Sequence, residues 1–284
     1  MLHSSVPKTR ITRKEGNRMF RTLSRVILPA VLLAWLPTAG AVDIEVAGST
    51  TVQPLAERLA EAFEQIDSSV HITIQGGGSS VGVRSAADGT ADIGNASREV
   101  KDSELAQHPN LVIHTIARDG IAIVTNSGVP VSGLTLDEVR GIFAGEITSW
   151  SALGGPDEMI TVVAREEGSG TRAAFEDMVM DESLIGLDAI LIPSNGGVRT
   201  TVSTTPNSIG FLSFGYIDDT VNALAINGID ATIENAASGV YPVVRPLNMI
   251  TDGEPSGAVA SWLNFIMGED GQAIVLEEGY VPVN

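Results

Sequence analysis

The sequence predicts an α/β protein, and three observations support this fold class. Short apolar runs typical of buried strands alternate with amphipathic helical stretches along most of the chain. In three places a strand-like run leads through a loop of Gly, Ser and Thr directly into a helix start. Roughly 240 residues remain after an N-terminal leader, which is enough for one large or two medium domains with their own cores.

The chain is organised around residues 165–171. The apolar run at 160–164 predicts a buried strand, and residues 172–178 predict a helix. A loop between them presents free backbone N–H groups and the positive end of a helix dipole. Ser169 can add a hydroxyl donor, and Arg165 can supply a charge on a planar fork that matches an oxyanion. The stretch therefore favours an anion site over an ordinary capped helix.

Two further loops share this design. Residues 43–47 and 70–74 each predict a strand. The first strand leads through residues 48–51 into an amphipathic helix, and the second leads through residues 76–80 into a short helix. If the three loops converge, their donors form a cage for a tetrahedral oxyanion. The candidate ligands in these loops are Thr50, Ser79, Arg165, Ser169, Gly170 and Thr171.

The other elements continue the alternation. Residues 91–98 predict a short strand and a polar loop. Two strands at 111–117 and 121–125 flank residues 118–120, which form a predicted hinge. Thr135 to Glu138 is a capping box for a helix through Phe143. Further strands are predicted at 187–193, 209–212, 223–226 and 241–247, and further helices at 259–267 and 270–277.

Residues 1–41 predict a cleavable signal peptide. They hold seven of the 17 Lys and Arg residues and one acidic residue, Glu15. An apolar core follows Arg25 and ends at the small residues 38–41, a cleavage signal of the Ala-x-Ala kind. Met19 is an alternative start, and an uncleaved anchor is the alternative interpretation of the segment. No later stretch of the sequence is long and apolar enough to cross a bilayer.

Composition excludes several kinds of partner. The mature chain keeps ten basic and 34 acidic residues, a net charge near −24, so nucleic acid and anionic membranes are not expected to bind it. An anion must then be held by local dipoles and one or two arginines. Arg165 is the first candidate and Arg98 the second, while the other arginines, Arg245 among them, are expected in surface or structural ion pairs. The absence of cysteine excludes disulfides, thiol catalysis and a cysteine-linked lipid anchor.

A hydrolase is the alternative class that the residues themselves suggest. Residues 78–82 match the G-x-S-x-G nucleophile elbow, with Ser80 as the nucleophile. His108 and His114 are the only histidines that follow, and the segment before them is too short for the acid-to-histidine order of such enzymes. The histidines show no metal-ligand spacing, and no G-x-x-x-x-G-K-[ST] loop is present. No catalytic residue, metal or cofactor is therefore expected.

Several segments together resemble one family, the extracytoplasmic phosphate-binding proteins that supply ABC-type phosphate transporters. The resemblance covers essentially the whole mature chain and implies a type II periplasmic-binding-protein fold, with two α/β lobes and a ligand cleft between them. It implies a first lobe at 43–117 plus 243–284 and a second lobe at 118–242. The segments that carry the resemblance are 48–54, 76–82, 91–98, 165–171 and 278–283.

The resemblance also implies ligand residues. Many family members carry an aspartate where this chain reads Ser97 and Arg98, and that aspartate accepts a hydrogen bond from the proton on phosphate. Glu167 is expected to face Arg165 and to hold its guanidinium group in place. The implied phosphate ligands are Thr50, Ser79, Ser97, Arg165, Ser169, Gly170 and Thr171, with Ser49, Ser80 and Arg98 as further candidates.

The expected function is that of a non-enzymatic, monomeric periplasmic receptor. It captures inorganic phosphate by closing its cleft and delivers the anion to a membrane permease powered by a separate ATPase. One alternative is a receptor for another tetrahedral oxyanion, such as sulfate, molybdate or arsenate. A secreted phosphoesterase or other hydrolase, and an adhesion or signalling protein on the same scaffold, are the alternatives from other classes.

Overall fold

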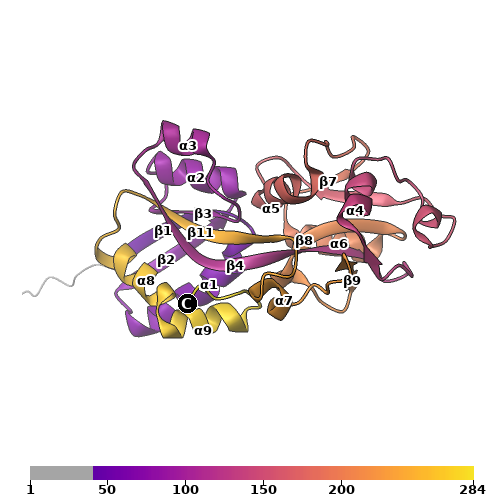
Figure 1. The fold of residues 1–284 in the computed structure, drawn as a ribbon. Helices are drawn as coiled ribbons and strands as arrows, with labels where there is room; N and C mark the ends of the chain where they lie inside the picture. The colour runs from indigo at the N-terminus through magenta and orange to yellow at the C-terminus, as the bar shows by residue number, and fades with distance from the viewer. Residues whose placement is uncertain (1–40) are drawn as a thin grey trace, which may run out of the picture. The chain divides into compact units, whose positions relative to one another are not determined.

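Strands and helices alternate along the chain, as expected of an α/β protein (Figure 1). The computed structural model describes residues 41–284, which belong to one compact unit. The predicted signal peptide, apart from Ala41, lies outside the described residues. Within residues 41–284, no helix has the length and apolar character needed to span a membrane.

Nine strands of the described chain form one mixed sheet. The eleven strands of residues 41–284, two of which lie outside this sheet, are β1 (Val42–Gly48), β2 (Val70–Gly76), β3 (Ile93–Ala96), β4 (Leu111–Asn126), β5 (Gly133–Leu134), β6 (Thr161–Arg165), β7 (Ile190–Ile192), β8 (Ser208–Ser213), β9 (Val221–Ala223), β10 (Ala225–Ile226) and β11 (Val244–Asp252). The sheet follows the order β2-β1-β3-β11-β4-β8-β6-β7, and β9 also pairs with β4. Parallel pairs join β1 to β2 and β3 at one end and β6 to β7 and β8 at the other. In the middle, β11 is antiparallel to β3 and β4, and β5 pairs separately with β10.

Helices connect the parallel strands, as the strand–loop–helix pattern predicts. The α-helices are α1 (Val52–Ile66), α2 (Ser79–Ala87), α3 (Asp102–Gln107), α4 (Leu136–Phe143), α5 (Gly170–Phe175), α6 (Asn195–Thr204), α7 (Ile233–Ala237), α8 (Gly257–Met267) and α9 (Glu269–Glu277). Shorter turns of other helix types are η1 (Trp150–Leu153), η2 (Glu176–Met180) and η3 (Phe214–Tyr216). The predicted capping box is present, because the hydroxyl of Thr135 accepts the N–H of Glu138 and the Glu138 carboxylate accepts the N–H of Thr135.

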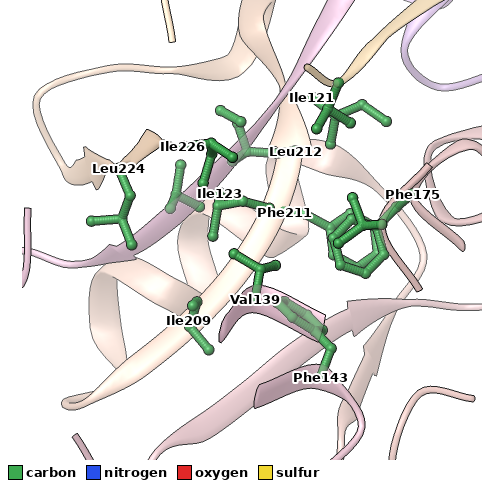
Figure 2. Close-up of a cluster of buried hydrophobic side chains, with 14 of the residues drawn as sticks. Ile121, Ile123, Val139, Phe143, Phe175, Ile209, Phe211, Leu212, Leu224 and Ile226 are labelled. Carbon is green, nitrogen blue, oxygen red and sulfur yellow. The ribbon is translucent and has the colours of Figure 1, made fainter. Parts of the chain in front are cut away.

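Two large apolar cores share β4 and β11. One core collects side chains from residues 44–117 and 247–280, and the other mainly from residues 121–243. Figure 2 shows part of the second core, where the rings of Phe175 and Phe211 stack with their centroids 4.2 Å apart. Both strands therefore run from one core to the other. The residues between the two cores are held in place by apolar packing at each end.

Strand β4 differs from the sequence prediction of two strands around residues 118–120. It runs unbroken because β11 pairs with it as far as Gly120 and β8 pairs with it from Ile121 onward. The backbone thus always has a hydrogen-bonding neighbour, and a hinge at this point stays a prediction. The strand expected at 187–193 shortens to β7, because only residues 190–192 find a partner in β6.

Candidate functional site

The loops that follow β1, β2 and β6 meet at one place. The N–H of Ser80 donates to the carbonyl of Gly168 at 3.2 Å. A Cβ atom on Gly170 would collide with the hydroxyls of Ser79 and Ser97, so the missing side chain of glycine permits this approach. The structure therefore brings together the residues of the three loops that the sequence singled out.

Arg165, at the end of β6, is only 1 % exposed. Its Nε and Nη2 donate to the carbonyls of Ile192 and Pro193 at 3.1 and 2.7 Å, which fixes the plane of the guanidinium. Nη2 also donates to the hydroxyl of Thr50 at 3.2 Å, and Nη1 lies 3.5 Å from the hydroxyl of Thr171. Burial and a second arginine nearby lower the pKa of Arg165 to about 10, so the side chain stays charged at neutral pH.

Glu167 and Arg98, two charged residues named from the sequence, have surroundings that differ from those expected. Glu167 is exposed and does not hold the fork of Arg165, because backbone carbonyls take that role. The guanidinium of Arg98 turns to Glu104, where both terminal nitrogens donate to the carboxylate at 2.8 Å. Its contact with the candidate loops is a 3.4 Å hydrogen bond from Nη2 to the hydroxyl of Ser80.

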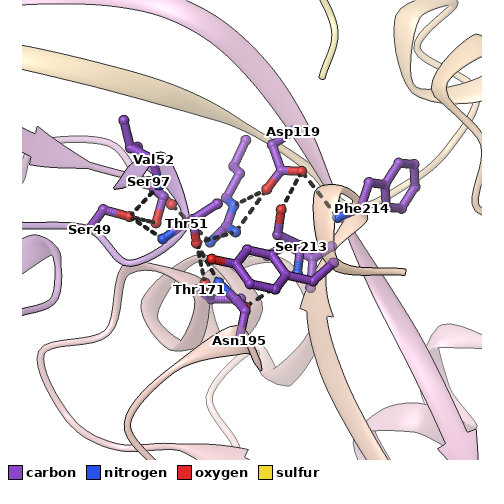
Figure 3. Close-up of polar contacts among 12 residues, drawn as sticks. Ser49, Thr51, Val52, Ser97, Asp119, Thr171, Asn195, Ser213 and Phe214 are labelled. Atoms are coloured by element: carbon purple, nitrogen blue, oxygen red, sulfur yellow. Dashed lines mark hydrogen bonds and ion pairs between the residues drawn. The ribbon is translucent and has the colours of Figure 1, made fainter. Parts of the chain in front are cut away.

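Ser49, Ser79 and Ser97 form a buried cluster of hydroxyls among the converging loops, and Figure 3 shows Ser49 beside Ser97. The hydroxyl of Ser49 accepts the N–H groups of Thr51 and Val52 at 3.1 and 3.3 Å and donates to the hydroxyl of Ser97 at 2.9 Å. The hydroxyl of Ser79 accepts the N–H of Ser97 at 3.0 Å and lies 3.4 Å from the Ser97 hydroxyl. Because hydroxyls both donate and accept, this neutral cluster can serve either role toward a ligand.

Helix α5 presents its first turn to the same place. Ser169 precedes the helix and its hydroxyl accepts the N–H of Arg172 at 3.2 Å. The N–H groups of Gly170 and Thr171 have no partner within the helix, since the first turn of any helix leaves its donors open. These groups, the hydroxyls and Arg165 together supply the donors that an oxyanion requires.

Two tyrosines fix the backbone of the loop after β1. The hydroxyl of Tyr216 donates to the carbonyl of Thr50 at 2.8 Å, and that of Tyr280 donates to the carbonyl of Thr51 at 3.1 Å. Burial raises the pKa of Tyr216 to about 12 and raises the pKa of Tyr280 as well. Both side chains therefore remain protonated donors at neutral pH. Among residues 41–284, no group of three or more His, Cys, Asp or Glu residues is placed to hold a metal ion.

Four buried residues in or next to these loops were not among the site residues named from the sequence, namely Thr51, Asp119, Asn195 and Arg245. Arg245 does make the structural ion pair expected of it, with Nη2 at 2.9 Å from Oδ2 of Asp119. Burial lowers the pKa of Arg245, and the neighbouring carboxylate opposes that shift. Thr51 directly precedes α1 and Asn195 begins α6, each after or within a Gly/Ser/Thr/Asn-rich stretch, which was the available signal for them.

Most of the chain matches one protein superfamily. A model of the PBP superfamily domain matches residues 36–270. The phosphate-binding protein PstS of Bacillus subtilis is 35% identical over 243 residues, which cover 85% of this chain and 81% of that protein. PstS of Borreliella burgdorferi is 28% identical over 252 residues, or 84% of this chain and 90% of that protein.

Solved structures agree with these relatives. A phosphate ABC transporter substrate-binding protein from Clostridium perfringens, with phosphate bound, has a TM-score of 0.82 and 38% identity, over 85% of this chain and all of that one. An ABC-type phosphate transport receptor from Vibrio cholerae has a TM-score of 0.72 and 33% identity, over 84% of this chain and 99% of that one. The chain belongs to the PBP superfamily and, within it, to the family of the phosphate-binding protein PstS.

Proposed function

We propose that this protein captures inorganic phosphate outside the cytoplasm and delivers it to an ABC-type importer. The observation that carries the proposal is Arg165, a buried cation whose four hydrogen bonds all go to neutral oxygens, beside hydroxyls and helix N-terminal amides. Such a charge is neutralised by a bound anion. Relatives named for phosphate binding, and a solved structure with phosphate bound, support the choice of anion.

The proposed ligand set follows from the converging loops. Hydroxyl and amide donors come from the loops after β1 and β2 on one side and from the start of α5 on the other. The lobes proposed to close on the anion are 43–117 plus 243–284 and 118–242. The proposed phosphate ligands are Thr50, Ser79, Ser97, Arg165, Ser169, Gly170 and Thr171, with Ser49 and Ser80 as further candidates.

Calorimetry with phosphate, sulfate, arsenate and molybdate tests the proposed ligand. We expect the tightest binding for phosphate, with arsenate next because its shape and protonation resemble those of phosphate. Tighter binding of sulfate or molybdate than of phosphate would assign the protein to a different oxyanion.

A receptor without catalytic activity is proposed, in line with relatives named for phosphate binding and transport. The competing hydrolase would use Ser80, whose hydroxyl accepts a hydrogen bond from Arg98. A chromogenic phosphate or carboxylate ester separates the two, since a receptor gives no turnover. Turnover that disappears in a Ser80→Ala variant would establish the hydrolase instead.

Export by a cleaved signal peptide is proposed for residues 1–41. The basic start, apolar core and small residues at 38–41 support it. Intact-mass spectrometry of the protein released by osmotic shock should give an N-terminus near Val42. A membrane-bound product that still begins at Met1 or Met19 would contradict this proposal.

A further inference from the structure

An ion pair occupies the passage between the two apolar cores. Asp119 on β4 and Arg245 on β11 are direct partners in the antiparallel register, and both are at most 2 % exposed. Nε and Nη2 of Arg245 donate to Oδ2 of Asp119 at 3.2 and 2.9 Å. The other oxygen, Oδ1, accepts the hydroxyl of Ser213 at 2.9 Å and the N–H of Phe214 at 3.2 Å. The pair is therefore held in one orientation from both strands.

Arg245 directs its other donors at the candidate site. Nη1 donates to the carbonyl of Ser97 at 3.0 Å, and Nη2 donates to the hydroxyl of Thr51 at 3.3 Å. Arginine has donors and no acceptor, so the hydroxyl of Thr51 must accept in this contact.

Asn195, the first residue of α6, also approaches the hydroxyl of Thr51 (Figure 3). Its amide orientation is determined by Ser213, whose backbone N–H donates to Oδ1 at 3.3 Å. The Nδ2 group therefore faces Thr51 and donates to its hydroxyl at 2.8 Å. Two donors now occupy both lone pairs of the Thr51 hydroxyl.

The proton of Thr51 then has one direction left. Its hydroxyl lies 3.1 Å from the hydroxyl of Thr171, which must accept this hydrogen bond. Arg165 also approaches the Thr171 hydroxyl, at 3.5 Å. Both lone pairs of the Thr171 hydroxyl then face donors, so its own proton is left to donate to a ligand bound at the first turn of α5.

We propose that Thr51, oriented by Arg245 and Asn195, is a positioning residue that makes Thr171 an obligate donor to the bound anion. The inference rests on the proposed phosphate site. It means that this corner of the site takes an unprotonated ligand oxygen, and that a proton on phosphate must be accepted elsewhere. Asp119 on β4 orients Arg245 on β11, and Arg245 in turn orients Thr51. The proposal therefore also connects the segment where these two strands pass between the cores to the bound anion.

Calorimetry with inorganic phosphate on three purified full-length variants tests the proposal. Thr51→Val keeps the shape and removes the hydroxyl, whereas Thr51→Ser keeps the hydroxyl. We expect phosphate to bind roughly 10- to 100-fold more weakly to Thr51→Val and within about threefold of the native affinity to Thr51→Ser. Thr251→Val removes a buried hydroxyl outside the site and should leave phosphate affinity unchanged.

The dependence on pH separates orientation from general damage. In the native protein the obligate donor favours the dibasic anion, so affinity should rise between about pH 6 and about pH 8 as phosphate loses a proton. In Thr51→Val the hydroxyl of Thr171 can turn and accept, so that rise should flatten. If Thr51→Val fails to fold, Asn195→Ala serves in its place, since it releases one lone pair of Thr51 and should also flatten the rise.

The outcomes distinguish this inference from the proposed function. A native protein that does not bind phosphate overturns the function itself. Native binding with an unchanged affinity and pH profile in Thr51→Val overturns only the positioning role. Equal losses in Thr51→Val and Thr51→Ser would also overturn it, because the hydroxyl would then not be the group that matters.

Discussion

At the scale of single residues, Arg165 is a buried cation whose hydrogen bonds all go to neutral groups. The carbonyls of Ile192 and Pro193 hold Arg165 without cancelling its charge, and the hydroxyls of Thr50 and Thr171 complete its contacts. Removing water from a cation is costly unless an anion pairs with it. A bound oxyanion would therefore contribute much of its affinity through this residue.

Arg165→Ala should weaken phosphate binding by more than about 100-fold. The loss follows because removing one partner of a buried ion pair costs roughly 3–5 kcal/mol. Arg172→Ala is the matched control, since Arg172 pairs with Glu176 and its Nη1 donates only to the backbone of Arg165. Titration calorimetry measures both variants, and equal losses would mean that Arg165 is not the anion's partner.

The serine cluster leads to a prediction about selectivity. Ser97 already accepts from Ser49 and lies 3.4 Å from Ser79, so these hydroxyls can accept the proton of phosphate or turn and donate to sulfate. Ser97→Asp introduces a group that only accepts, and an acceptor without a donor facing an anion is costly. Sulfate binding should therefore fall roughly 10-fold or more relative to phosphate binding.

Ser97→Asn is the matched control for this comparison, because it has the size of aspartate and can still donate. Its ratio of phosphate to sulfate affinity should stay close to that of the native protein. Competition calorimetry at neutral pH gives both ratios. If Ser97→Asp and Ser97→Asn behave alike, charge at this position does not set selectivity.

At the scale of elements, α3 anchors the loop that carries Ser97. Glu104 on α3 accepts two hydrogen bonds from Arg98, and its Oε2 also accepts the N–H of Lys101. Burial alone would raise the pKa of Glu104, but the hydrogen bonds and charge of Arg98 and the N–H of Lys101 bring it below its ordinary value of 4.5. Ionised Glu104 therefore stabilises the folded state.

Glu104→Gln should lower the free energy of unfolding by about 1–2 kcal/mol at neutral pH. A carboxyl group whose pKa is lowered by folding contributes fully above its unfolded pKa, and the contribution is lost as the pH falls through the folded value. The difference between Glu104→Gln and the native protein should thus shrink below about pH 4.5. Urea unfolding across this range measures it.

The exposed pair of Asp137 and Arg140 provides the control, since the side chain of Asp137 is 87 % exposed. Asp137→Asn should change stability by less than about 1 kcal/mol. If its effect equals that of Glu104→Gln, the buried position of Arg98 has no special role.

At the scale of the molecule, hydrogen bonds at the site join the parts of the chain that carry the two cores. Ser80 contacts Gly168, and Thr50 contacts Arg165. An anion bound among these loops would add contacts to both parts at once. A ligand that binds only the folded chain stabilises it in proportion to the logarithm of its concentration over its Kd.

Phosphate at a hundred times its Kd should add about 2.7 kcal/mol to the free energy of unfolding. For a chain of this size that corresponds to a rise in Tm of roughly 5–10 °C. Differential scanning calorimetry with and without phosphate measures the shift. The Arg165→Ala variant should show little of it at the same concentration, and a full shift in that variant would indicate binding elsewhere.

Local patterns in the sequence were sufficient to predict the alternating α/β order, the strand–loop–helix units and the loop of Arg165. These features depend on the spacing of apolar residues and on the residues at helix starts, and both are visible within a single strand or helix. The predicted strand boundaries were wrong where pairing with a strand that is distant in the sequence decides them. Residues 118–120 stay in a strand because β11 and β8 pair on either side, and residues 187–189 find no strand to join.

Residue patterns along the chain were enough to predict the fold class, the family and the residue types that an anion site needs. The direction in which those residues face depends on the folded chain. Arg98 turns to Glu104, the fork of Arg165 rests on backbone carbonyls, and Thr51 receives two donors from β11 and α6. The physical reason is that the direction of a hydrogen bond depends on every group around it, and most of those groups are far away in the chain.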